Sequence, residues 1–397
     1  MDDVIVMGAG PGGNSAAYHL ATMGYRITVI ERKETIGDKL CSGIVGAECL
    51  ERYPAQKSHI LRESRSARFF SPSGVEVDLS KDGPQAYVMD RVRYVASIGE
   101  KAQKAGARYL LQHNVIDIDP SADLVEVTAE GPHGTEKLQA KAMVLGGGFG
   151  SRFTRRLGLG YVKDFTTGAQ AEVMAPHLEE VQVYFGRKVA PNFFGWMVPT
   201  TGHKALVGLL SRRNAPHYLQ SFISTLQARG EAAAVTKKAS HWGVPLQSLA
   251  RTSGHRVLVV GDAAGQVKPT TGGGIYYALL AGELAAQSLD KAFRAGDLGA
   301  EQLSDYDKSW KALMSHDLGI GRGARHLFET LKDDQIDSLM QTIATNGIRA
   351  DILNSKEFSF DWHGGAIVRA LGHPLFSGAL RFISPLATRM AARMISN

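Results

Sequence analysis

The chain opens with a strand, a glycine-rich turn and a helix, and this order narrows the possible folds most. Asp3–Met7 is an apolar run typical of a buried strand, and the glycine-rich segment Gly8–Gly13 follows at once. Residues 14–23 have a helical pattern, and Arg26–Ile30 is a second strand that ends at Glu31. This is the G-x-G-x-x-G fingerprint in its expected setting, so the sequence predicts a Rossmann-like α/β domain that binds a dinucleotide.

Each position of the fingerprint has its own expected task. Gly8 makes the tight turn, Gly10 lets a pyrophosphate approach the backbone, and Gly13 lets the helix pack closely on the strand. Glu31 is expected to bind the ribose hydroxyls of the adenosine half, and the Arg that follows it is typical of flavoproteins. The expected cofactor residues of this segment are Gly8, Gly10, Pro11, Gly12, Gly13, Glu31 and Arg32.

A second glycine-rich loop follows another apolar strand about 250 residues later, at 257–260. Asp262 at the end of that strand can accept hydrogen bonds from ligand hydroxyls, and the helix after the loop directs its unpaired N–H groups back at the ligand. A simple nicotinamide enzyme needs no such remote loop, whereas an extended flavin does, so the sequence favours FAD over NAD. The expected cofactor residues here are Gly261, Asp262, Gly272, Gly273, Gly274 and Ile275.

The loop Cys41-Ser42-Gly43, together with the two glycine-rich segments, resembles the geranylgeranyl reductase family. That family belongs to the para-hydroxybenzoate hydroxylase-like flavoproteins. The resemblance extends along most of the chain, and the Pro-Thr-Thr-Gly-Gly-Gly-Ile loop at 269–275 is its most specific part. It implies a Rossmann-like FAD-binding domain, a mainly antiparallel substrate domain and a C-terminal helical segment. It also implies that hydride from reduced flavin saturates C=C bonds of a polyprenyl chain.

The resemblance also implies roles for single residues. Cys41, Ser42 and Gly43 would lie beside the flavin, and Arg91 matches a family arginine that contacts the cofactor. Cys41 either donates a proton or shapes the site, since a thiol is a weak acid that is mostly protonated at neutral pH; alternatively it is a small buried hydrophobe. Residues 143–158 depart from the related pattern because the expected Asp is missing, so they receive no role.

The substrate side is expected on an aromatic strand. Residues 191–199 resemble the family motif Tyr-x-Trp-x-Phe-Pro, with Phe194 in place of Tyr and Val198 in place of Phe, while Trp196 and Pro199 match. Such a strand suits a polyprenyl chain, whose binding is mainly burial of apolar groups; the alternative is ordinary sheet core. The expected substrate-binding residues are Phe194, Trp196, Pro199 and His241, although His241 could equally belong to a packed loop.

We expect a discontinuous FAD-binding domain formed by residues 1–65, 87–160 and 254–320. Residues 66–86 and 161–253 form the expected substrate domain, and 321–397 a C-terminal helical region. Within these ranges, the segments 67–70 and 74–77 read as a hairpin, and Tyr87–Arg91 as the start of a helix that reaches about residue 105.

Composition limits the partners. The net charge of the chain is +6, which suits an anionic cofactor or an anionic membrane surface. Nucleic-acid binding would require a dense stripe of Lys and Arg, and the sequence shows none. Cys41 and Cys49 fit neither a zinc pattern nor a disulfide framework, so we expect no metal and a reducing cytoplasm. The oligomeric state stays open, with a monomer favoured. Residues 364–397 place Arg369, Arg381, Arg389 and Arg393 among apolar residues, and either lie on an anionic membrane or cap the substrate tunnel.

Several alternatives stay open. With one dinucleotide fingerprint, the electron donor is either NAD(P)H docking briefly at the flavin or a ferredoxin-like protein. The prenyl chain could belong to an ether lipid, a prenyl diphosphate, a quinone or a chlorophyll. The same FAD elements also occur in flavin monooxygenases and halogenases, and a flavoprotein that only carries prenyl lipids is a third possibility.

Overall fold

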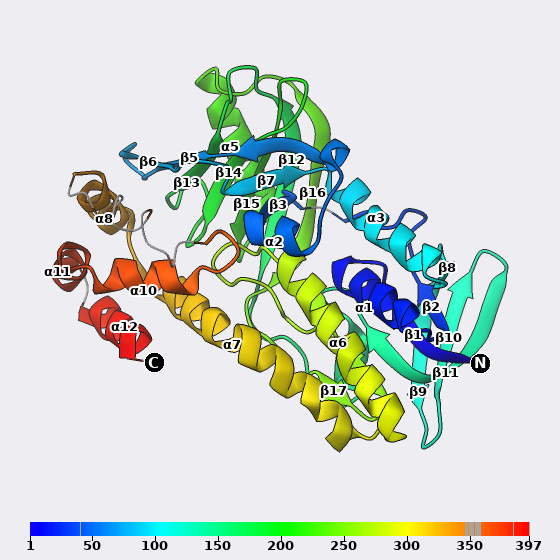
Figure 1. Cartoon of the computed structure of the whole chain (residues 1–397). Coiled ribbons are helices and arrows are strands. Elements are labelled where there is room, and N and C mark those ends of the chain that lie inside the picture. The colour runs from blue at the N-terminus through cyan, green and yellow to red at the C-terminus, as the bar shows by residue number, and fades with distance from the viewer. Residues whose placement is uncertain (40, 346–347, 349–352, 354–358, 384, 397) are drawn as a thin grey trace. The chain divides into compact units, whose positions relative to one another are not determined.

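The computed structural model describes residues 1–39, 41–345, 348, 353, 359–383 and 385–396, and it divides into two compact units. The first unit contains Met1–Lys39, Arg91–Phe165 and Val244–His316. The second contains Leu40–Asp90, Thr166–Gly243 and Asp317–Asn397. Figure 1 labels many of the elements of both units.

The first unit is built on a sheet of the Rossmann type. Its parallel strands lie in the order β18, β11, β1, β2 and β8, and β17 pairs antiparallel with β18 at one edge. A hairpin of β9 and β10 extends β11. The bounds are β1 Asp2–Met7, β2 Ile27–Ile30, β8 Arg108–Leu110, β9 Asn114–Pro120, β10 Val125–Gly131, β11 Gly134–Leu145, β17 Ser253–Gly254 and β18 Val257–Val259. The predicted α/β class is confirmed.

Helices pack on this sheet because its strands are apolar on both faces. Helix α1 (Pro11–Thr22) contacts both α3 (Arg91–Lys104) and α6 (Ile275–Ala295). A core cluster joins the sheet residues Ile5, Ile30 and Leu145 to residues of the β9–β10 hairpin such as Val127. The remaining helices of this unit are α4 (Arg152–Arg156), the short 3-10 helix η2 (Gly261–Ala263) and the first part of α7 (Ala300–Thr330).

The second unit contains a seven-stranded sheet in the order β16, β12, β15, β14, β13, β5 and β6. The pairings of β12 with β15, β15 with β14, β14 with β13 and β5 with β6 are antiparallel, whereas β13 pairs parallel with β5. The predicted mainly antiparallel sheet and its hairpin of β5 and β6 are therefore confirmed. The bounds are β5 Ser66–Phe70, β6 Glu76–Ser80, β12 Phe165–Met174, β13 Val181–Phe185, β14 Phe194–Pro199, β15 Lys204–Ser211 and β16 Val235–Pro245.

A smaller sheet in the second unit corrects one prediction. Residues 87–89, expected as the start of a helix, belong to strand β7 (Ala86–Met89), which lies between β3 (Ile44–Gly46) and β4 (Ile60–Ser64). Only at Arg91 does the helix, α3, begin. The β-branched and aromatic residues before Asp90 suit a pleated strand.

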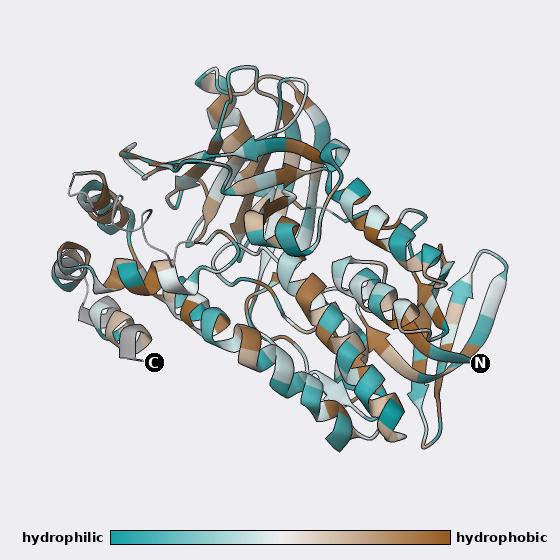
Figure 2. Cartoon of the chain, in the orientation of Figure 1, coloured by the Kyte–Doolittle hydropathy of each residue, from teal (hydrophilic) through white to brown (hydrophobic). Residues whose placement is uncertain are grey.

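Helices cover both faces of the seven-stranded sheet. α5 (Ala215–Ala228) packs on one face, where Phe222 contacts the Tyr184 ring. On the other face, a second core cluster joins sheet residues such as Val77 and Phe185 to Leu331, Leu339 and Leu380. The helices behind this cluster are the end of α7, α8 (Asp333–Thr345), α10 (Gly364–Gly372), α11 (Pro374–Ile383) and α12 (Pro385–Ser396); α2 (Ala47–Arg52) and the 3-10 helix η1 (Lys57–His59) complete the unit. Figure 2 shows hydrophobic and hydrophilic turns alternating along α7.

The bounds of the two compact units differ from those of the expected domains at several places. Three short segments change unit, since residues 87–90 lie in the second unit and residues 161–165 and 244–253 lie in the first. Residues 40–65 belong to the second unit, since β3 and β4 pair with β7. Residues 317–397 also belong to the second unit, because α8 and α10–α12 share a core with its sheet. Among the described residues, no helix is both long and apolar enough to traverse a bilayer.

Candidate functional site

The first glycine loop has the geometry that an anionic ligand requires. Gly8 has a φ of +94°, and a β-carbon there would lie 2.5 Å from the carbonyl oxygen of Gly146. At Gly10 a β-carbon would meet no protein atom within 4 Å, so the loop faces open space there. Helix α1 starts at Pro11 without a side-chain cap, which leaves its first N–H groups available to a ligand.

The acidic residue at the end of β2 holds this loop in place. One carboxylate oxygen of Glu31 accepts a hydrogen bond from the Ala9 N–H at 2.7 Å, and the other accepts one from the Lys33 N–H at 3.0 Å. Glu31 is half-buried, whereas Arg32 is exposed. The structure therefore brings Glu31 to the loop, with hydrogen bonds to the backbone as its visible contacts.

The two glycine-rich loops meet because their helices pack together. A β-carbon on Gly282 of α6 would lie 2.3 Å from the Gly12 carbonyl oxygen, and the Ser15 hydroxyl donates to the Leu279 carbonyl at 2.7 Å. Gly13 is equally restricted, since its β-carbon would lie 2.0 Å from the Gly8 carbonyl oxygen. Figure 1 shows α1 and α6 side by side. Segments far apart in the sequence, such as Ser15 and Leu279, which are 264 positions apart, are thus brought together beside the first glycine-rich loop.

The second loop is fixed by buried polar residues. The Gln266 side chain accepts a hydrogen bond from the Gly261 N–H at 2.8 Å and donates to the Tyr306 hydroxyl at 3.0 Å. That hydroxyl donates to the Val259 carbonyl at 2.9 Å, and burial raises the pKa of Tyr306, so it stays protonated. Helix α6 then starts at Ile275 behind three glycines, again without a side-chain cap.

Arg91 and Asp262 both contact the segment that precedes Cys41 in the sequence. The buried Arg91 guanidinium donates from Nη1 to the carbonyls of Gly37 and Lys39, the latter at 3.0 Å. The Lys39 ammonium forms an ion pair with the Asp262 carboxylate. The expected flavin contact of Arg91 stays a prediction, because the observed role of Nη1 is to hold this segment.

Cys41, Ser42 and Gly43 lie in the second unit at the start of β3. The Cys41 thiol is partly exposed, and its sulfur accepts the Gly43 N–H at 3.4 Å. Gly43 has a φ of +71° and its carbonyl accepts the Met89 N–H at 3.0 Å. The Cys41 carbonyl accepts a hydrogen bond from the Gln170 side chain at 3.3 Å, which places this loop beside strand β12.

The expected substrate residues lie on different faces of the sheet, because successive side chains of a strand point to opposite sides. Phe194 and Trp196 lie two residues apart on β14, so they share a face, and their ring centroids are 5.9 Å apart. Pro199 is buried and points to the opposite face, the one that contains Met197. On β16, His241 is exposed and points away from the side taken by Trp242.

Trp242, which was not among the expected substrate residues, lies on the same face as Trp196. A β-carbon on Gly168 would lie 2.8 Å from the Trp242 indole, and Gly168 lies two residues before Gln170 on β12. The Gln170 side chain accepts a hydrogen bond from the Trp196 indole N–H at 3.3 Å. The structure therefore gathers Trp196, Trp242, Phe194 and Gln170 on one face, without His241.

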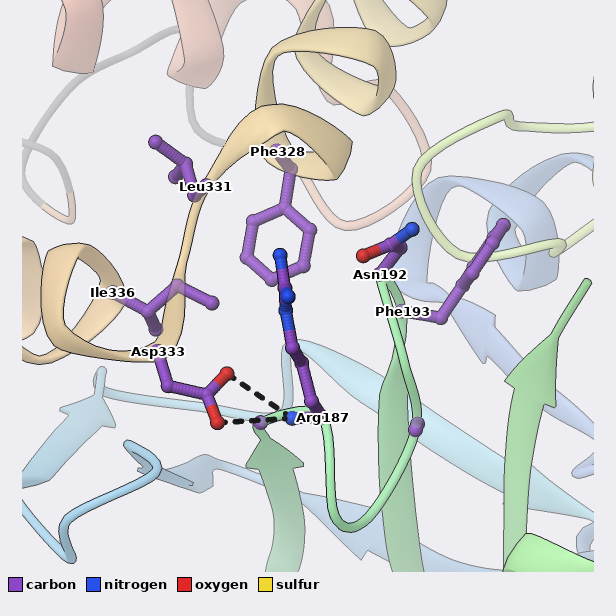
Figure 3. Close-up of a pocket in the computed structure, with 9 residues that line it drawn as sticks. Arg187, Asn192, Phe193, Phe328, Leu331, Asp333 and Ile336 are labelled. Carbon is purple, nitrogen blue, oxygen red and sulfur yellow. Dashed lines mark hydrogen bonds between the residues drawn. The ribbon is translucent and has the colours of Figure 1, made fainter. Parts of the chain in front are cut away.

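A small pocket opens elsewhere in the second unit. Figure 3 shows the Arg187 side chain extending past the Phe328 ring, with the Asp333 carboxylate turned to the Arg187 backbone N–H. Nearby, the buried Arg325 guanidinium lies 3.9 Å from the centroid of Phe193. None of the residues that line this pocket was expected in the site from the sequence. They are Gly186, Arg187, Ala190, Asn192, Phe193, Phe328, Leu331, Asp333 and Ile336.

Three comparisons give the relatives of this chain. Residues 2–183 match the family model for pyridine nucleotide-disulphide oxidoreductases. A digeranylgeranylglycerophospholipid reductase of Methanocaldococcus jannaschii is 30% identical over 90% of this chain and 93% of its own length.

Among solved structures, a geranylgeranyl bacteriochlorophyll reductase-like protein from Thermoplasma acidophilum has a TM-score of 0.84 at 22% identity, with 99% of both chains covered. A p-nitrophenol 4-monooxygenase from Pseudomonas putida has a TM-score of 0.72 at 17% identity, covering 89% of this chain and 96% of its own. At these identities, the structural likenesses describe the fold.

Proposed function

The chain belongs to the digeranylgeranylglycerophospholipid reductase family, and from this premise we propose that it saturates the geranylgeranyl chains of a glycerophospholipid. It is an FAD-dependent oxidoreductase that acts on C=C bonds. The monooxygenase and halogenase alternatives rest on distant likeness of fold. The structural observation that carries the proposal is the apolar sheet face bearing Phe194, Trp196 and Trp242, to which Gln170 ties the Cys41 loop.

The residues of the first unit fit FAD. The open space at Gly10 and the uncapped starts of α1 and α6 suit a pyrophosphate, and in this proposal Glu31 and Asp262 would accept hydrogen bonds from the cofactor hydroxyls. When bound in its reduced form, FAD supplies the hydride that an isolated double bond requires. We assign the first loop, Glu31 and the Gly272–Gly274 segment to cofactor binding.

The second unit would hold the alkene. An isolated trisubstituted double bond has no carbonyl to polarise it, so close placement in a dry site must lower the barrier. Phe194 and Trp196 provide the apolar surface on which the prenyl chain would pack. The partly exposed Cys41 thiol is our candidate for the donor of the proton, which is added to the carbon of the double bond that does not receive the hydride. Phe194 stands where the family motif has Tyr, so no hydroxyl competes with Cys41 at that position.

The test is a single-turnover reaction. The FAD-loaded protein is reduced with dithionite under anaerobic conditions and mixed with a geranylgeranyl glycerophospholipid. The mass of the product is then measured by mass spectrometry. We expect a gain of two hydrogens per double bond and reoxidation of the flavin. An unchanged lipid mass, followed by incorporation of oxygen into an aromatic substrate in air, would show that the protein is a monooxygenase instead. If no reductant supports turnover, the remaining function is that of a flavoprotein that carries prenyl lipids.

Cys41 is tested in the same assay. Cys41→Ala should retain FAD and lose most of its rate, whereas the control Cys49→Ala, which alters the fully buried cysteine of α2, should keep its rate. A Cys41→Ala protein with full turnover contradicts the role of proton donor. For the electron donor, NADH, NADPH and a reduced ferredoxin are compared by their rates of flavin bleaching.

We further propose that the second unit binds an anionic membrane surface through α10–α12. Arg369, Arg381 and Arg389 are exposed, and the sequence contains no Asp or Glu after Asp361. The protein should float with vesicles that contain anionic phospholipid and remain behind with neutral ones. Changing these three arginines to Gln should abolish flotation, while a matched triple change at exposed Arg93, Arg229 and Arg294 should not.

A further inference from the structure

Gln170 occupies a central position on the aromatic face of the second unit. It lies on β12, is 4% exposed, and is paired in register with Gly208 of β15, which is in turn paired with Trp196 of β14. Residues paired in this way point to the same side of an antiparallel sheet. The Trp196 indole therefore extends across the intervening strand to reach Gln170.

The intervening residue has to be glycine. A β-carbon on Gly208 would lie 2.4–2.7 Å from three atoms of the Trp196 indole, so the ring rests directly on the backbone of β15. The Phe194 ring lies beside it, with 5.9 Å between centroids. These contacts fix the plane of the indole, and its N–H therefore points toward Gln170.

The amide of Gln170 has one orientation that satisfies both neighbours. The Trp196 indole N–H can only donate, so it requires the amide oxygen, and the Cys41 carbonyl can only accept, so it requires the amide NH₂. Both hydrogen bonds measure 3.3 Å. A carboxylate would serve the indole but not the carbonyl, and an aliphatic side chain would serve neither.

We infer that Gln170 is a positioning residue that sets the distance between the Trp196 surface and the Cys41 loop, and thereby selects which double bond of a prenyl chain meets the thiol. The inference rests on the proposed function. It adds a determinant of regiospecificity that neither the glycine motifs nor the aromatic motif contains. Gln170 itself contacts no reacting atom in this account, since it acts through the two residues that it joins.

Three variants separate the two hydrogen bonds. Gln170→Leu removes both, Gln170→Glu keeps the acceptor for Trp196 and loses the donor to Cys41, and Trp196→Phe removes the indole donor. The matched control is Gln182→Leu on β13. That glutamine accepts from the Tyr184 hydroxyl at 2.6 Å and lies on the opposite face of the same sheet.

The first readout is independent of turnover. The rate of Cys41 alkylation by iodoacetamide is followed in the FAD-loaded protein by peptide mass, with the buried Cys49 as an internal reference. Releasing the Cys41 carbonyl should change this rate about 2- to 10-fold in Gln170→Leu and Gln170→Glu, the range that one hydrogen bond of ordinary net strength supports. Gln182→Leu should leave the alkylation rate unchanged.

The second readout is the position of the reduced double bonds after partial turnover with dithionite. Gln170→Leu, Gln170→Glu and Trp196→Phe should each shift the distribution of positions, and Gln170→Leu combined with Trp196→Phe should shift it no further than Gln170→Leu alone. Unchanged alkylation and an unchanged distribution in both Gln170 variants overturn the inference. If wild type reduces no prenyl chain, the proposed function fails, while the alkylation result still decides whether Gln170 holds the Cys41 loop.

Discussion

Gly282 of α6 lies against the backbone of Gly12 in α1, so closely that a β-carbon on Gly282 would be 2.3 Å from the Gly12 carbonyl oxygen. The same β-carbon would lie 2.8 Å from the Ser15 side chain and 2.9 Å from the Ala16 nitrogen. These are mostly backbone atoms, which cannot move aside as the end of a flexible side chain can. The pairing of the two cofactor loops thus depends on the absence of one methyl group.

Gly282→Ala should therefore push α6 away from the start of α1. Overpacking of this kind costs about 1–3 kcal/mol, which exceeds the gain of up to about 1 kcal/mol from replacing Gly by Ala in a helix. We expect a lower melting temperature and a reduced ratio of FAD to protein after gel filtration, measured by absorbance. Gly319→Ala in α7 is the control, because its β-carbon would meet nothing within 4 Å, and it should retain FAD with equal or greater stability. A Gly282→Ala protein that keeps full FAD and stability contradicts the close crossing.

Gly208→Ala should displace the Trp196 indole, since the new methyl would overlap three ring atoms. We expect a loss of about 1–3 kcal/mol in the free energy of unfolding, measured by urea denaturation. In a Trp196→Leu background the same substitution should cost clearly less, because the overlapping ring is gone. Equal costs in both backgrounds would show that the indole does not rest on Gly208.

The sequence predicted those features that depend on local pattern. The fingerprint at 8–13 required a strand before it and a helix after it, and Phe194 and Trp196 share a face because strand side chains alternate. The contacts of Lys39 with Asp262, of Gln170 with Cys41 and of Asp361 with α2 join residues 223, 129 and more than 300 positions apart. No local pattern marks such partners.

Two local features that the sequence pattern left ambiguous have physical causes. His241 and Trp242 are neighbours, and only the register of β16 decides which of them faces the aromatic side, so the choice of His241 could not be made from composition. Residues 87–89 were expected at the start of a helix, yet pairing with β3 and β4 makes them part of strand β7. In both cases tertiary pairing determined what the sequence pattern left ambiguous.

Asp361→Ala should loosen α2 and the strand before it. The Asp361 carboxylate, 2% exposed, accepts hydrogen bonds from the Gly46 and Cys49 N–H groups at 3.0 Å each, and so caps the start of α2. Leaving these buried donors unpaired should cost about 2 kcal/mol. Cys49, fully buried in the native protein, should then react faster with iodoacetamide below the melting temperature. Asp361→Asn keeps one acceptor oxygen, so the reactivity of its Cys49 should lie between that of wild type and that of Asp361→Ala. If Cys49 reacts as fast in Asp361→Asn as in Asp361→Ala, Asp361 does not cap α2 through these hydrogen bonds.

Asp337 should make stability depend on pH in the acidic range. Partial burial raises the pKa of Asp337, but hydrogen bonds from the Ser71 and Ser73 side chains and the Ser73 N–H outweigh it, so the pKa lies below its ordinary value of 3.8. A carboxyl group whose pKa is depressed on folding contributes stability above its unfolded pKa and loses it as the pH falls through the folded pKa.

At pH 7, Asp337→Asn should therefore be less stable than wild type by about 1 kcal/mol, a value reduced for the solvent exposure of the site. The difference should shrink below about pH 4. Urea unfolding at pH 3–7 measures it, with exposed Asp334→Asn on the same helix as control. A wild-type advantage that stays constant, or grows, as the pH falls would contradict an ionised Asp337 held by these serines.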